Sequence, residues 1–233
     1  MGKTMTHKQP TEREWTKTRR QAQILDAAFK EFAANGYAAT KLDNVAKRAR
    51  VAKGTIFLHF RDKKALFRAV LCSVIQPVRA DFDAGPSGPS SANETMLRRS
   101  VARLYEGLVE NKKARALLRL LVAESDKFPE LADIYYSKVI APGAATFGCV
   151  IEKGIAAGEF QGADMSGIRR FPQILVAPAV LATVWILLLN NRQTLDLVAY
   201  RKTHIDFMLR ALRRDPGADA AKEKTPVQLG EAS

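Results

Sequence analysis

The chain has 233 residues, of which 47% are hydrophobic, and a formal net charge of +13 at pH 7. This length allows one large domain or two smaller ones, and two fit better because the charge is uneven: residues 1–70 hold 16 Lys or Arg against 6 Asp or Glu, whereas residues 71–233 hold 21 against 18. The two cysteines lack paired spacing and the N-terminus lacks an apolar stretch, so a disulfide framework, a cysteine zinc site and a secretory signal are not expected and the cytoplasm is the expected compartment.

The basic first third of the chain predicts a module that binds a polyanion, with a solvated basic face as the alternative. Residues 1–18 are expected to form a basic N-terminal arm. A first helix is predicted over residues 16–35, and Gly36 is able to take a left-handed cap. The apolar face of this helix consists of Leu25, Ala28, Phe29 and Phe32.

Residues 40–60 have the pattern of two short helices joined by a tight turn. Thr40 is placed to cap the first of them with its hydroxyl, and the apolar stripe that follows is Leu42, Val45, Ala46 and Ala49. After a turn at residues 49–51, a second short helix spans about residues 52–59. Val51, Ile56 and Phe60 are expected to anchor it. This pattern predicts a helix-turn-helix whose second helix enters the major groove of DNA.

The outward positions of this motif suit contacts with DNA. Gly54 allows close approach, Thr55 is suited to a base edge or a thymine methyl, and Lys53 to guanine or phosphate. Thr40 and Lys63 are expected to meet phosphates, through backbone donors and a hydroxyl in the first case and a charge in the second. The predicted DNA-binding residues are Thr40, Lys41, Arg50, Lys53, Gly54, Thr55, Phe57, His59 and Lys63.

Residues 19–71 resemble the N-terminal domain of the TetR family of one-component transcriptional regulators. The shared features are Ile24-Leu25-Asp26-Ala27-Ala28 with Phe32 and Gly36-Tyr37, then Val45-Ala46, Ala49, Val51, Lys53-Gly54-Thr55-Ile56, His59-Phe60, and Lys63 with Leu66-Phe67. The resemblance implies a homodimeric repressor whose two heads bind a palindromic operator about one helical turn apart. It also implies release from double-stranded DNA by a small-molecule effector.

Three positions depart from the pattern of that family. Arg50 stands where glycine is usual in the turn, so it must accept a positive φ at a cost on the order of 1 kcal/mol or reshape the turn. Ala52 stands where a serine usually caps the second helix, which forfeits about 1 kcal/mol of capping. Phe57 replaces the usual tyrosine and lacks its hydroxyl. These departures affect individual contacts and leave the architecture in place.

The remaining pattern is helical, which predicts an all-α fold. Asp62 is placed to cap a fourth helix that Pro77 kinks or ends. Residues 83–93 read as a surface loop and residues 215–233 as a disordered tail. Between them, helices are predicted over residues 96–109, 114–124, 129–141, 146–157, 167–190 and 194–213. The expected organisation is an arm (1–18), a helix-turn-helix domain (19–71), a helical effector-binding and dimerisation domain (72–214) and the tail.

Residues 174–189 form a run of sixteen residues without a charge. A membrane span needs about 20 apolar residues, so this run is short for a span. A helix that is apolar all round must be buried on every side, and a homodimer interface accounts for it economically. The resemblance places that interface in the helices of about 167–190 and 194–213. A membrane-associated protein with a basic cytoplasmic head is the alternative.

No catalytic motif, metal-ligand spacing or phosphate-binding glycine loop is present in the sequence, so an enzyme, a metal and a cofactor are not expected. An effector pocket is expected between helices of the second domain, although ordinary core packing is the favoured explanation for each residue taken singly. The candidate pocket residues are Leu104, Leu108, Leu121, Phe147, Ile151 and Trp185.

Overall fold

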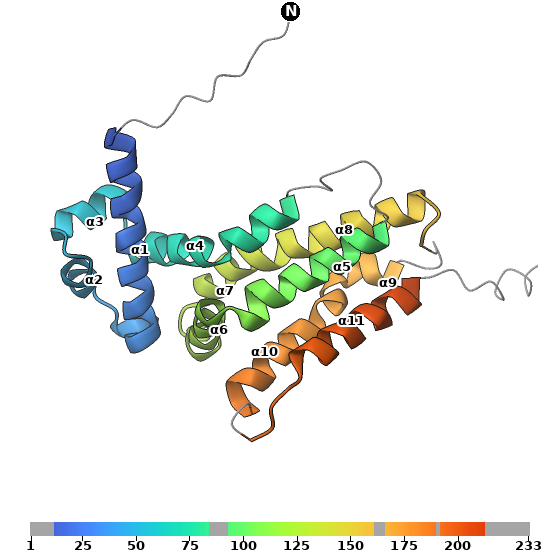
Figure 1. Ribbon diagram of the computed structural model, residues 1–233. Coiled ribbons are helices and arrows are strands. Elements are labelled where there is room, and N and C mark those ends of the chain that lie inside the picture. Colours follow the sequence, from blue (N-terminus) through green and yellow to red (C-terminus); the bar gives the residue numbers. More distant parts are fainter. Residues whose placement is uncertain (1–11, 84–92, 161–165, 190–191, 213–233) are drawn as a thin grey trace, which may run out of the picture. The chain divides into compact units, whose positions relative to one another are not determined.

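Helices make up all of the regular structure in the residues that the computed structural model describes, which are 12–83, 93–160, 166–189 and 192–212 (Figure 1). The predicted all-α fold class is confirmed. The predicted tail and most of the predicted N-terminal arm lie outside these residues. In chain order the elements are α1 (Glu12–Ala39), α2 (Leu42–Ala49), α3 (Lys53–His59), α4 (Lys63–Asp83), α5 (Asn93–Leu104), η1 (Tyr105–Glu110), α6 (Lys112–Glu124), α7 (Pro129–Tyr135), η2 (Tyr136–Ile140), α8 (Ala141–Ala156), α9 (Ser166–Arg170), η3 (Pro172–Leu175), α10 (Ala177–Leu189) and α11 (Leu197–Leu212).

Two compact units are present, and neither is continuous in sequence. The first consists of Met1–Pro77 with Asn111–Val139, and the second of Val78–Glu110 with Ile140–Ser233. The helices α6 and α7 therefore pack with the N-terminal helices, although they are distant from them in the chain. The boundary expected near residue 71 stays a prediction.

An aromatic cluster forms the centre of the first unit. Phe32 of α1 and Phe67 of α4 meet edge to face with ring centroids 5.4 Å apart, and Tyr37 packs against both. Phe128, which precedes α7, meets Tyr37 with its centroid at 5.0 Å. Phe32 and Phe67 are fully buried, so each contributes roughly 1.5 to 3 kcal/mol of hydrophobic stabilisation.

Two predicted helix ends of the first unit are observed. The helical course of α1 is interrupted at Gly36, whose φ of 75° and ψ of 174° suit only glycine. Asp62 caps α4, since its Oδ1 accepts a hydrogen bond from the N–H of Ala65 at 2.7 Å. That bond lowers the pKa of Asp62 below its ordinary value. Pro77 does not end α4, because the helix continues to Asp83.

The core of the second unit is mainly apolar and contains a buried polar pair, Tyr105 and His204. Residues such as Val101, Phe147, Ile151 and Ala179 are almost completely buried in it. The hydroxyl of Tyr105 lies 3.2 Å from Nδ1 of His204, and Nε2 of His204 lies 3.0 Å from the carbonyl oxygen of Leu175. A carbonyl only accepts, so Nε2 carries the proton and Nδ1 accepts from Tyr105. Both ring nitrogens of His204 thus have partners within the core.

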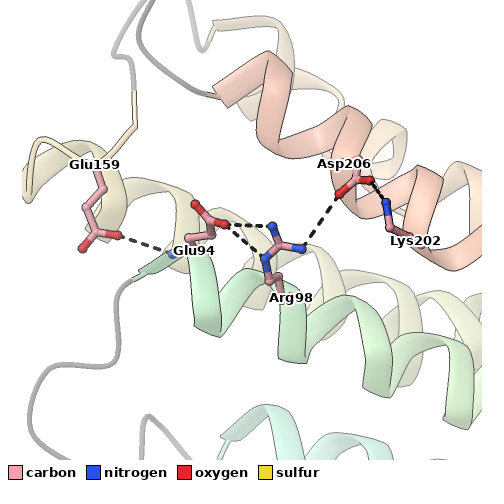
Figure 2. A network of polar contacts seen from close by, with 5 residues as sticks. All are labelled: Glu94, Arg98, Glu159, Lys202 and Asp206. Carbon is pink, nitrogen blue, oxygen red and sulfur yellow. Dashed lines mark hydrogen bonds and ion pairs between the residues drawn. The ribbon is translucent and has the colours of Figure 1, made fainter.

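A chain of polar contacts crosses the surface of the second unit (Figure 2). Glu159 accepts a hydrogen bond at 3.4 Å from the N–H of Glu94, in the first turn of α5. Arg98 donates to the carboxylate of Glu94 at 2.8 Å and lies 3.9 Å from Asp206 of α11, which pairs with Lys202 at 2.7 Å. Each such exposed ion pair stabilises the fold by less than about 1 kcal/mol.

The structure differs from the prediction at residues 167–190 and at residues 141–146. The single helix predicted over residues 167–190 is wrong, because the chain forms α9, η3 and α10 there. Pro172 opens η3 and Pro178 occupies the first turn of α10, where a missing N–H costs no helical bond. In contrast, the break predicted between residues 141 and 146 is absent. There α8 runs from Ala141 to Ala156 with Pro142 in its first turn.

We expect the substitution His204→Gln to make the stability of the protein less dependent on pH in the mildly acidic range. Burial lowers the pKa of His204 below its usual 6.5, so the unfolded chain takes up a proton first as the pH falls through 6.5. This uptake lowers the free energy of unfolding of the wild type, whereas glutamine has no proton to take up. Urea unfolding at about pH 7.5 and about pH 5.5 measures the effect. An equal loss of stability in both proteins would contradict it.

Candidate nucleic-acid interface

The turn between α2 and α3 is left-handed, which is the first of the two alternatives that the sequence left open for Arg50. Arg50 has φ 53° and ψ 45°, and among the described residues it is the non-glycine residue with a positive φ. The N–H of Arg50 bonds the carbonyl of Lys47 at 3.1 Å, and the N–H of Val51 bonds the carbonyl of Ala46 at 3.1 Å. These bonds satisfy the last carbonyls of α2 and redirect the chain into α3.

Helix α3 has one buried and one exposed face. Ile56 is 0% exposed and Phe60, which follows the helix, is 5% exposed, so both are anchors as predicted. On the other side Phe57 is 47% and Leu58 is 85% exposed. Ala52, which precedes α3, makes no side-chain cap, as expected for alanine. A helix of seven residues that exposes two large apolar side chains presents a surface suited to a partner.

Gly54 lies on the exposed side of α3 with open space around it. A Cβ built at this position meets no atom within 4 Å. The fold itself therefore does not require glycine here. Thr55 and His59 are half-buried, whereas Lys53 is exposed.

Helix α2 is held against α1 by an apolar stripe and one ion pair. Val45, Ala46 and Ala49 are buried against the core. Glu31 of α1 is only 4% exposed and accepts from Nε of Arg48 at 2.7 Å. A buried carboxylate without its partner is costly, so this pair also restrains how α2 lies on α1.

The basic residues of the motif differ in what they contact. Lys41 and Arg50, two of the predicted DNA-binding residues, are exposed. Lys53 is also exposed, but its ammonium pairs with Asp43 of α2 at 2.9 Å. A DNA contact by Lys53 therefore exchanges an existing exposed ion pair for a new one, at a cost below about 1 kcal/mol.

Thr40 does not cap α2. Its side chain is 2% exposed and its hydroxyl donates to the carbonyl of Gly36 at 2.6 Å, while Lys41 occupies the cap position without a side-chain bond. The predicted capping role is wrong because the positive φ of Gly36 turns its carbonyl toward Thr40. The phosphate contact of Thr40 stays a prediction that the backbone alone would have to supply.

Lys63 is engaged within the fold. Its ammonium donates to the carbonyl oxygens of Tyr37, Ala38 and Thr40 at 2.7, 3.0 and 3.2 Å and lies 4.7 Å from the centre of the Tyr37 ring. All three of its donors are used, and burial lowers its pKa below the ordinary value. The predicted phosphate contact of Lys63 would require these bonds to be given up.

Leu58 is a candidate DNA-contacting residue that the sequence reasoning did not select. Because Ile56 and Phe60 both point inward, the residue midway between them lies on the opposite side of the helix. That spacing was the available signal. A leucine at this exposed position suits contact with a thymine methyl or a sugar.

The six candidate effector residues do not all belong to the same compact unit. Phe147 and Ile151 are buried in the core of the second unit, and Leu104 packs against that core. Trp185 of α10 donates from Nε1 to the carbonyl of Gln193 at 3.0 Å. Leu108 is half-buried. Leu121 lies in the first unit.

One continuous helical stretch, Pro129–Ala156, is long and apolar enough to cross a membrane, and Ala177–Leu189 is a shorter apolar helix. The longer stretch comprises α7, η2 and α8. Its residues Leu131 and Phe147 are fully buried, but only 22% of its apolar window is buried in all. One stretch of this length and composition is weak evidence for a membrane span, so the membrane-associated alternative is not favoured.

Two family models match the chain. Residues 24–70 match the model of bacterial regulatory proteins of the tetR family, and residues 95–167 match the C-terminal domain of AefR-like transcriptional repressors. The first range contains the whole helix-turn-helix.

The similarity extends to individual relatives. The chain is 33% identical to the HTH-type transcriptional regulator YhgD of Bacillus subtilis over 47% of this chain and 54% of that protein. It is 30% identical to the regulator AcrR of Shigella flexneri over 50% of this chain and 56% of that protein. The chain thus spans about half the length of these two relatives. A third relative, the fatty acid metabolism regulator protein of Bacillus subtilis, is 26% identical over 80% of this chain and 92% of its own.

Solved structures share the fold. A TetR transcription regulator from Haloarcula marismortui aligns with a TM-score of 0.68 at 17% identity, covering 84% of this chain and all of that one. FadR from Bacillus subtilis, solved with stearoyl-CoA, aligns with a TM-score of 0.60 at 22% identity, covering 82% of this chain and 99% of that one.

We expect the substitution Arg50→Gly to raise the melting temperature, because glycine adopts φ 53° without the strain that a Cβ imposes. The gain is on the order of 1 kcal/mol, reduced by the greater entropy of glycine in the unfolded chain. Thermal unfolding followed by circular dichroism measures it. The control is Arg50→Ala, which removes the same charge but keeps the Cβ and should not stabilise. A clear drop for the glycine variant would contradict the strained turn.

We expect the substitution Gly54→Ala to weaken DNA binding without destabilising the fold. The added methyl group meets open space in the free protein, and alanine favours a helix by up to about 1 kcal/mol over glycine. On DNA the same methyl group would separate α3 from the groove. Thermal unfolding and a DNA-binding titration of both proteins give the two readouts. Unchanged affinity would show that Gly54 does not serve close approach.

Proposed function

The chain belongs to the TetR family of DNA-binding transcriptional regulators, and from this premise we propose that it is a homodimeric repressor that a small-molecule effector releases from a palindromic operator. The observation that carries the proposal is α3, a seven-residue helix with open space at Gly54 and exposed side chains at Phe57 and Leu58. Such a helix fits the major groove of DNA. The proposed compartment is the cytoplasm.

Base contacts in this proposal come from α3 and phosphate contacts from its surroundings. Lys53, Thr55 and Phe57 read base edges and thymine methyl groups. Lys41, Arg50 and His59 bind phosphates, which set the register but do not distinguish sequences. The net charge of +10 in residues 1–70 attracts the DNA from a distance, and salt screens that attraction.

Dimerisation in this proposal uses the exposed apolar faces of α10 and α11. On α10 the side chains of Leu181, Val184 and Leu188 recur at helical spacing and are 56%, 38% and 73% exposed. On α11 Phe207 is 72% exposed. A second copy that covers these faces removes the apolar side chains from water and brings two copies of α3 to one DNA molecule.

The effector in this proposal is a small molecule that binds between helices of the second unit. It prefers a conformation with mis-spaced recognition helices, so it lowers operator affinity by roughly 1 to 3 kcal/mol. One relative, which matches over 80% of this chain, is a fatty acid metabolism regulator protein, and FadR was solved with stearoyl-CoA. Stearoyl-CoA is therefore the first compound to add to the operator complex.

Selection of bound sequences from random duplex DNA by the full chain tests the proposal. We expect a palindromic consensus with half-sites about one helical turn apart, and an affinity that falls steeply with salt. A lack of any sequence preference, or an affinity that does not change between low and moderate salt, would contradict it.

A matched pair of variants tests the dimer in the same assay. Phe207→Asp places a charge in the proposed interface, so we expect a monomer and roughly hundredfold weaker operator binding. Val198→Asp is the control, because Val198 is also 72% exposed but lies nine residues away, on the opposite side of α11. Sedimentation velocity gives the state of association. A dimeric Phe207→Asp protein would contradict the assignment of this face.

A further inference from the structure

Glu124, the last residue of α6, holds the chain that leads from α1 into α2. Its Oε1 accepts a hydrogen bond from the N–H of Tyr37 at 2.7 Å, and its Oε2 accepts from the N–H of Ala38 at 3.2 Å. The two residues are 87 and 86 positions away in sequence. A carboxylate that accepts from two backbone donors makes charge-assisted bonds, which are stronger than bonds between neutral groups.

The same short segment is held from its other side by Lys63. The ammonium of Lys63 donates hydrogen bonds to the carbonyl oxygens of Tyr37, Ala38 and Thr40. Charged side chains therefore bind both the N–H and the carbonyl groups of Tyr37 and Ala38. The charge of Glu124 also favours the protonated form of Lys63. Tyr37 itself is buried among Phe32, Phe67 and Phe128.

Gly36 has the conformation and the space that this arrangement needs. Its φ of 75° turns the chain, and a Cβ at this position would collide with the carboxylate of Glu124. The absence of a side chain therefore lets the carboxylate reach the N–H groups of Tyr37 and Ala38. This close approach is a second reason for glycine here, in addition to its backbone angles.

We infer that Glu124 is a positioning residue for DNA recognition. This inference rests on the function proposed above. Residues 37–40 lead directly into Lys41, whose carbonyl accepts the first bonds of α2 from Asn44 and Val45 at 3.0 and 3.3 Å. The turn at Arg50 then connects α2 to α3. Glu124 thus sets the direction of α2 and, through it, the angle at which α3 meets the groove, although Glu124 itself does not touch DNA.

Substitutions at Glu124 in the full-length protein test this inference with the selected operator and with random-sequence DNA. We expect Glu124→Ala to lower operator affinity roughly tenfold or more while its affinity for random-sequence DNA stays unchanged, because phosphate contacts tolerate a change of angle that base contacts do not. Glu124→Gln keeps one acceptor oxygen, so we expect a smaller loss. The matched control is Asp126→Asn, which removes the same charge from an exposed position two residues away and should bind as the wild type.

A merely structural role of Glu124 has a different outcome. It would lower the melting temperature and leave the ratio of operator to random-sequence affinity as in the wild type, measured where circular dichroism shows both proteins folded. That outcome overturns the inference. If the alanine variant does not fold, the ratio for the glutamine variant decides. A wild type without sequence preference would instead contradict the proposed function itself.

Discussion

The recognition helix exists because two side chains, Ile56 and Phe60, bury one of its sides. A helix of seven residues has too few internal hydrogen bonds to be stable alone in water, so α3 depends on packing for its structure as well as its position. The left-handed turn at Arg50 redirects the chain so that α3 packs against α2. With one side anchored, the other side is left for a partner, and there Phe57 and Leu58 are exposed.

Some charged residues of the helix-turn-helix region bind groups within the fold, and others are exposed on its surface. The residue type alone does not show which use a given residue has. Arg48 and Lys63 bind groups of the protein, Glu31 in one case and backbone carbonyls in the other. Lys41 and Arg50 extend into solvent. The basic excess in the sequence is therefore a correct sign of DNA binding but an overestimate of the charges that are free to meet phosphates. Exposure alone does not separate the two uses, since Arg48 is 45% exposed and still pairs with Glu31, a buried carboxylate that needs a partner.

The second unit combines a closed core with open apolar surfaces. Tyr105 bonds His204 and His204 bonds the carbonyl of Leu175, so the polar atoms of these two buried side chains have partners within the core. On α10 and α11, by contrast, Leu181, Leu188 and Phe207 are exposed. The charge-free run that first suggested a membrane span is divided between η3 and α10, which makes it shorter still.

Helical periodicity and turn chemistry act within a few residues, so the sequence determined the all-α class, the helix-turn-helix, the cap at Asp62 and the inward side of α3. For Arg50 the sequence left two conformations open, and the structure has the positive φ. Partners that are distant in the chain were decided only by the tertiary structure. Lys63 and Thr40 matched a phosphate-binding pattern, yet the turn at Gly36 gave both of them backbone carbonyls as partners. Glu124 has no local signal for its role, since the N–H groups that it holds lie 87 and 86 residues away and only packing of α6 against α1 brings them together.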